Sequence, residues 1–116
     1  MAELQAKQGV VNQAMGRVDR ERSSLIQIQV EQKRNSIEIE RAQDKLDHSS
    51  DAIEQKRFTD EVEHLKANVS ALKVEEQARQ SSLDEAQQRL RDSQDALEDV
   101  QNRLNAMTKK LNPGEH

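Results

Sequence analysis

The stretch Ile53-Glu54-Gln55-Lys56-Arg57-Phe58 separates two series of seven-residue repeats that together run through most of the chain. In each series the first position of the repeat, position a, is apolar with one polar exception. The a positions are Leu4, Val11, Val18, Leu25, Gln32, Ile39, Leu46 and Ile53 in the first series, and Val62, Val69, Glu76, Leu83, Leu90, Leu97, Leu104 and Leu111 in the second. Such spacing is typical of coiled-coil helices, whose a and d positions form the seam between two helices.

The two series differ in phase, because Ile53 and Val62 are nine residues apart and not seven. At about 100° per residue, nine residues rotate the apolar seam by roughly half a turn. One continuous helix would therefore carry its seam on opposite faces, which indicates that the chain reverses. Asn112-Pro113-Gly114 is expected to end the second helix. The predicted elements are helix one over about 3–54, a turn over about 54–59 formed by Glu54, Gln55, Lys56 and Arg57, helix two over about 60–111, and a tail over 112–116.

Polar side chains interrupt both seams near their middle. In antiparallel helices a faces d, so facing residues have numbers with a constant sum. A sum of 111 pairs the interruptions with each other: Gln32 faces Arg79 and Asn35 faces Glu76. Buried polar pairs penalise slipped pairings, so this layer is predicted to fix the register; the alternative is a partner site or a hinge. The same sum places Ala42 opposite Val69. An antiparallel dimer of extended chains obeys the same pairing, but the phase break favours the hairpin.

An additional set of apolar side chains with helical spacing lies away from the seam. This interaction stripe consists of Ile26, Val30 and Ile37 on helix one and Ala67, Ala71, Val74 and Ala78 on helix two. Exposed apolar residues grouped in this way suggest that another helix packs there. The predicted fold is an all-α, antiparallel two-helix coiled-coil hairpin over residues 1–116 that pairs with a second copy into a four-helix bundle. A different protein covering the stripe is the alternative.

The composition excludes several classes of function. Hydrophobic residues make up 33% of the 116 residues, there is a single aromatic side chain, and the net charge is −4 with no basic block. Nucleic acid and membranes are therefore not expected partners. No nucleophile–base pair, glycine-rich phosphate loop or metal-binding motif is present, and His48 and His64 lack a third ligand with suitable spacing. We expect no enzymatic activity, no cofactor, no metal and no small-molecule ligand. The default location is the cytoplasm.

The functional prediction is a coiled-coil structural or scaffold protein that acts through self-association, as a homodimer, and through protein–protein interaction. The alternative is an adaptor, stalk or chaperone-like helical hairpin that binds a heterologous protein partner, for example in a secretion-type assembly. That alternative rests on an analogy of shape, since many helical hairpins of both kinds look alike and no motif of this chain is specific to either.

Overall fold

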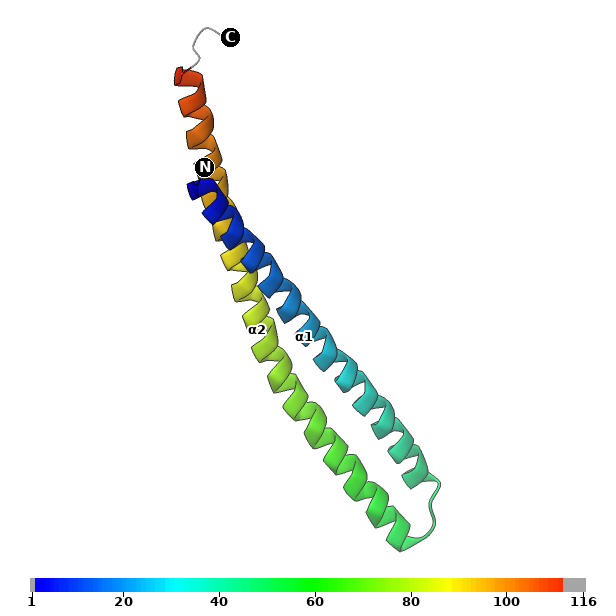
Figure 1. The fold of residues 1–116 in the computed structure, drawn as a ribbon. Helices are drawn as coiled ribbons and strands as arrows, with labels where there is room; N and C mark the ends of the chain where they lie inside the picture. Colours follow the sequence, from blue (N-terminus) through cyan, green and yellow to red (C-terminus); the bar gives the residue numbers. More distant parts are fainter. Residues whose placement is uncertain (1, 112–116) are drawn as a thin grey trace. The chain divides into compact units, whose positions relative to one another are not determined.

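The computed structural model describes residues 2–111, which form two helices and contain no strand (Figure 1). Helix α1 spans Ala2–Asp47 and helix α2 spans Ala52–Leu111, with 46 and 60 residues respectively. The chain is rich in good helix formers such as Leu, Ala, Gln, Glu and Arg, and its single proline lies after α2. The predicted all-α helical hairpin is confirmed. The expected stop at Asn112-Pro113-Gly114 lies outside the described residues.

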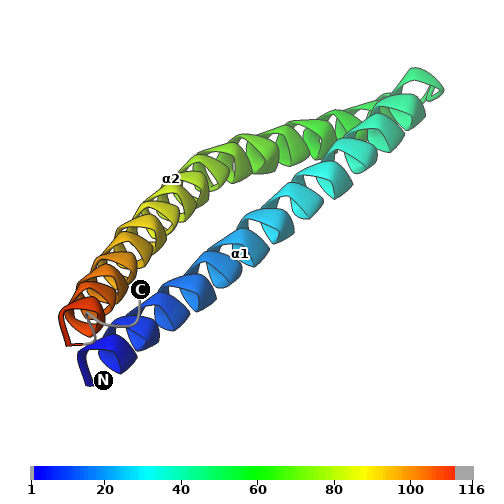
Figure 2. The same cartoon turned by 90° about the horizontal axis from the view of Figure 1, so that it is seen from above.

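The helices contribute to two compact units. The turn unit comprises Ser23–Ser81, and the terminal unit comprises Met1–Arg22 with Ser82–His116. Each unit therefore contains one stretch of α1 and one stretch of α2. On either side of the connection between the helices, the two stretches of the turn unit lie side by side and run in opposite directions (Figures 1 and 2).

The predicted a and d positions form the seam in both units. All buried side chains occupy an a or a d position: Val11, Val18, Leu25, Ile28, Ala42, Val62, Leu65, Leu83, Ala86, Ser93 and Val100. No large side chain among the described residues is fully enclosed. This is the burial expected when only two helices share one narrow contact, because each seam residue keeps one side toward solvent.

The turn lies at residues 48–51 and not at the predicted 54–59. Glu54, Gln55, Lys56 and Arg57 therefore belong to the first turns of α2, and this part of the prediction is wrong. Ile53, which continues the seven-residue spacing of α1, is 81% exposed and takes no part in the seam.

Hydrogen bonds explain why the chain reverses at Ser49-Ser50-Asp51. The Asp51 carboxylate accepts the backbone N–H of Ile53 (3.1 Å), and the Asp51 carbonyl accepts the N–H of Gln55 (2.9 Å), so Asp51 is the N-cap of α2. The Gln55 side chain donates to the Ser49 carbonyl (2.7 Å), and the Ser49 hydroxyl donates to Glu54 (3.3 Å). No described residue has a positive φ, so this turn does not require a glycine.

Replacing Asp51 by alanine is expected to destabilise the hairpin by about 1 kcal/mol, because an N–H at the start of α2 then loses its acceptor. Thermal unfolding followed by circular dichroism measures the change. Asp51→Asn is the control, since the asparagine side chain accepts the same hydrogen bond and should retain most of the stability. Equal losses in both variants would show that capping by the side chain is not the cause.

The register between the helices differs from the predicted one by a single heptad. Ala42 packs in one cluster with Val62 and Leu65, whereas a sum of 111 would place Ala42 opposite Val69. The numbers of Ala42 and Val62 add to 104. Nearer the turn, the Lys45 ammonium lies 5.9 Å from the centre of the Phe58 ring, which agrees with the same register because these numbers add to 103. The smaller sum follows from the position of the turn. Because the turn at 48–51 lies earlier in the sequence than the predicted turn at 54–59, the residues that face each other across it have smaller numbers.

Candidate interaction surfaces

The predicted polar layer is not assembled. Gln32, Asn35 and Glu76 are half-buried, whereas Arg79 is exposed and pairs with Glu75 on its own helix (3.8 Å). The Gln32 amide nitrogen is buried without a hydrogen-bond partner. In the part of the chain that the structure describes, no hydrogen bond or ion pair joins Gln32 to Arg79 or Asn35 to Glu76. The shift of one heptad accounts for this, because it places the polar residues of each helix beside apolar residues of the other.

The interaction stripe is exposed. Ile26, Val30 and Ile37 on α1 are 51%, 46% and 46% exposed, and Val74 on α2 is 70% exposed. The remaining stripe residues, all on α2, are also exposed: Ala67, Ala71 and Ala78. All of them occupy b, c or f positions, which lie on the side of a helix away from its a/d seam. In the turn unit the two parts of the stripe therefore lie on the sides of α1 and α2 that face away from the seam.

Two shallow hollows mark the surface of the turn unit. One, of about 260 Å³, runs along α1. It is lined by Ile26, Gln27, Val30, Glu31 and Arg34. The other, of about 240 Å³, lies between the helices. It is lined by Glu31, Asn35, Asn68, Ala71 and Leu72. Glu31 thus borders both the apolar stripe of α1 and the groove that separates the two helices.

The terminal unit carries a basic groove that the sequence analysis missed. This arginine groove, of about 460 Å³, is lined by Val10, Gln13, Ala14, Arg17, Arg20, Ala86 and Arg89. Arg89 pairs with Glu85 on its own helix (2.8 Å), whereas Arg17 and Arg20 have no ion pair among the described residues. The predicted register hid this feature, because a sum one heptad larger places Arg17 and Arg89 at different levels.

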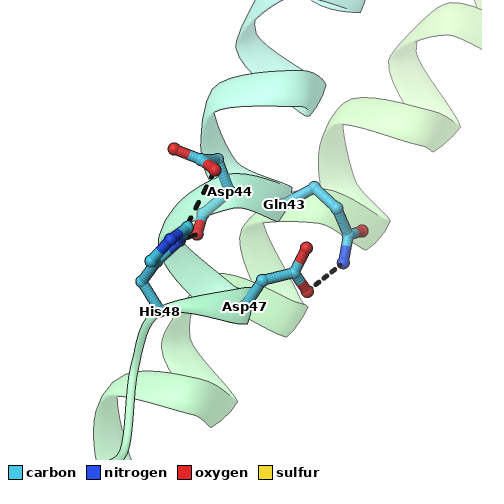
Figure 3. Close-up of polar contacts among 4 residues, drawn as sticks. All are labelled: Gln43, Asp44, Asp47 and His48. Atoms are coloured by element: carbon cyan, nitrogen blue, oxygen red, sulfur yellow. Dashed lines mark hydrogen bonds and ion pairs between the residues drawn. The ribbon is translucent and has the colours of Figure 1, made fainter.

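His48 directly follows Asp47, the last residue of α1 (Figure 3). Its ring Nδ1 lies 2.8 Å from the Asp44 carbonyl oxygen and 3.5 Å from the Asp44 carboxylate. The hydrogen bond to the Asp44 backbone, the charge of the Asp44 carboxylate and that of Asp47 all raise the pKa of His48 above its usual 6.5. Beside it, the Gln43 amide donates to the Asp47 carboxylate (3.3 Å), as Figure 3 shows. A protonated imidazole is favourable here because a helix C-terminus attracts cations.

The stability of the hairpin is therefore expected to depend weakly on pH through His48. Because its folded pKa is raised, the contribution of the protonated ring is fully present below about pH 6.5, the value of the unfolded chain, and is lost as pH rises through the folded pKa. Melting temperatures between about pH 5 and about pH 8 should fall more in the natural chain than in a His48→Gln variant. An identical pH dependence in both proteins would contradict this assignment.

Other kinds of site find little support in the described residues. None of their His, Asp and Glu side chains gather in a group of three that could hold a metal ion. Neither α1 nor α2 contains a segment that is apolar over the length of a membrane span. Searches of known protein families, curated proteins and solved structures found no match to this chain.

Proposed function

We propose that this chain is a non-enzymatic coiled-coil structural protein that acts as a scaffold through self-association and through contacts with other proteins. The observation that carries the proposal is the thinness of the hydrophobic core. Within residues 2–111 the hairpin buries one seam, encloses no large side chain completely, and leaves Ile26, Val30, Ile37 and Val74 about half exposed or more. Further helices packed against the hairpin would cover this apolar surface, which favours association.

A catalytic role has no comparable support. The hollows of the described residues are shallow and open, and they lie on the outside of paired helices. Catalysis generally needs a concave site from which water can be excluded. Exposed aliphatic side chains at helical spacing are instead a kind of surface on which a further helix packs.

The solution mass of the chain tests self-association directly. Sedimentation equilibrium or light scattering over a wide range of protein concentrations is expected to show a dimer that dissociates on dilution. A chain that stays monomeric at the highest concentrations would overturn the proposal. Far-UV circular dichroism recorded at each concentration would show whether the helices persist when the partner is removed.

A second candidate function is that of an adaptor that offers the stripe of α1 to a helix of another protein. It is favoured by Ile26, Val30 and Ile37, which lie on one face of α1 and remain exposed beside a hollow in the turn unit. Ile37→Glu tests this role, because it should abolish binding of such a partner while leaving the hairpin folded. Loss of the helical signal in that variant would mean that Ile37 serves the hairpin itself.

A further inference from the structure

The middle of the seam in the turn unit is poorly matched in the observed register. The contact of Ala42 with Val62 sets the sum of facing residue numbers at 104. This sum places Gln32 opposite Leu72, so a polar side chain meets an apolar one, and the Gln32 amide nitrogen is buried without a hydrogen-bond partner. The other mismatched pairs of the turn unit are Leu25 with Arg79, Ile28 with Glu76 and Asn35 with Val69.

Burial shows that this part of the seam is loosely packed. Between Ile28 and Ala42 on α1, and between Leu65 and Leu83 on α2, none of the a and d residues is buried. The hollow of about 240 Å³ between the helices lies here, with Leu72 in its lining. Well-matched seam residues would fill such a space, because close packing leaves few voids between paired helices.

A shift of one heptad, to a sum of 111, removes the mismatches of the turn unit. Gln32 then faces Arg79, whose guanidinium can donate a hydrogen bond to the glutamine amide oxygen. Polar residues meet polar residues and apolar residues meet apolar residues at the other levels as well. These pairs are Asn35 with Glu76, Ile39 with Leu72, Ala42 with Val69, and Leu46 with Leu65.

The same shift covers an apolar side chain near the turn. Ile53 occupies an a position but is 81% exposed at the start of α2. With a sum of 111, Ile53 faces Phe58, which is half-buried in the observed register. The shift therefore brings a large exposed apolar residue into the seam.

The terminal unit has the observed register too and contains a similar exposed residue. The ion pair of Glu3 with Arg103 (3.0 Å) joins two g positions, whose sum of 106 corresponds to a sum of 104 for facing a and d positions. Met107 occupies a d position of α2 but is 57% exposed, because no residue of α1 has the number that would face it. With a sum of 111, Met107 faces Leu4.

We propose that the hairpin has a second register, in which α1 and α2 are displaced along each other by one heptad, about 10 Å, within each unit. The turn of the observed register is stabilised by Asp51, which caps α2, and by Gln55, which donates to the Ser49 carbonyl. The seam favours the shifted register instead. Because these two preferences oppose each other, the shifted register is a minor state with a population of about 0.1–10%. The inference does not depend on self-association.

The register determines whether the arginine groove is assembled. In the observed register Arg17 and Arg89 both line this groove, and their numbers add to 106. In the shifted register Arg17 lies opposite Ala96, one heptad further along α2, and the two arginines separate. A ligand that binds one register more tightly than the other would shift the equilibrium between them. The hairpin would then act as a two-state element.

Disulfide trapping tests for the second register, since the natural chain contains no cysteine. Ala42→Cys with Val69→Cys places the two sulfurs together only in the shifted register. In the observed register the two positions are offset by one heptad, about 10 Å, whereas a disulfide needs Cα atoms within about 7 Å. The reference is Ala42→Cys with Val62→Cys, which closes in the observed register. The shifted pair is expected to oxidise about ten to a thousand times more slowly than the reference, in proportion to its population.

Two controls separate a register shift from general opening of the hairpin. Ala42→Cys with Glu76→Cys closes in neither register and is expected to oxidise at least about tenfold more slowly than the shifted pair, because it requires unfolding. Adding Ile53→Ala to the shifted pair should slow its oxidation at least about threefold, since the contact of Ile53 with Phe58 exists only in that register. The same substitution should leave the rate of the reference pair unchanged.

Oxidation is followed at low protein concentration by electrophoresis without reductant, which identifies disulfides formed within one chain. Circular dichroism verifies that each reduced variant is folded, and Ile39→Cys with Leu72→Cys, which has the same sum of 111, replaces the shifted pair if that variant is not. A shifted pair that oxidises no faster than the Ala42→Cys with Glu76→Cys control, or at a rate that Ile53→Ala does not change, would overturn the inference.

Discussion

Replacing Leu65 by alanine is expected to lower the free energy of unfolding by about 2–3 kcal/mol. Leu65 is 7% exposed and packs with Ala42 and Val62 in the core of the turn unit. Truncation removes apolar surface and leaves a gap that the helices can close only in part. The total stability of a small domain is about 5–15 kcal/mol, so the change should be plain in chemical denaturation followed by circular dichroism.

The matched control is Ile53→Ala. Ile53 occupies an a position of the seven-residue pattern, as expected of a seam residue, yet it is 81% exposed at the start of α2. Its truncation should change the stability by less than about 0.5 kcal/mol, as is usual for surface substitutions. A large loss at Ile53 together with a small loss at Leu65 would contradict the turn at 48–51, because it would place Ile53 in the seam.

The seam itself could be predicted from the sequence because burial between two helices requires a fixed period. Val11, Val18 and Leu25 in α1, and Val62 and Leu83 in α2, were identified by seven-residue spacing and are buried. The reversal of the chain was likewise indicated by the phase difference between the two series. Both inferences depend only on the geometry of a helix, which is the same in every sequence.

The position of the turn could not be obtained from the same spacing. Ile53 continues the period of α1, which extended the predicted helix beyond Asp47. Local chemistry gives the better signal here, since Ser49-Ser50-Asp51 contains favoured turn and capping residues. The Glu54 carboxylate three residues after Asp51 resembles a capping box, although the structure uses it to accept the Ser49 hydroxyl. An apolar residue that continues the seven-residue spacing of a seam, as Ile53 does, can thus be exposed and lie outside the seam.

The register was predicted from the polar residues of the two seams and not from the turn, and its error carried over to the candidate site. Matching polar with polar residues favoured a sum of 111, but a turn at 48–51 requires a sum one heptad smaller. The larger sum separated Arg17 from Arg89, so the arginine groove was not apparent. Once the register is known, the position of Arg17 opposite Arg89 can be read from the sequence alone.

Replacing Gln32 by leucine is expected to raise the free energy of unfolding by about 1–2 kcal/mol. The Gln32 amide nitrogen is buried and has no hydrogen-bond partner, and leaving a buried polar group unsatisfied costs about 1–3 kcal/mol. Leucine removes this group and adds apolar contact at an a position of the seam. If Gln32 instead paired with Arg79, as predicted from the sequence, the substitution would lower the free energy of unfolding, because it would leave the Arg79 guanidinium without its partner.

Two further variants separate these explanations. Gln29→Leu introduces the same side chain at an exposed position of α1 and should change the stability by less than about 0.5 kcal/mol, which corrects for helix propensity. Arg79→Leu should have a similarly small effect, since the Arg79 side chain is 44% exposed and pairs only weakly with Glu75. If Gln32→Leu and Arg79→Leu each destabilised the hairpin and the double variant recovered the loss, the two residues would be coupled and the register deduced from the Ala42 cluster would be wrong.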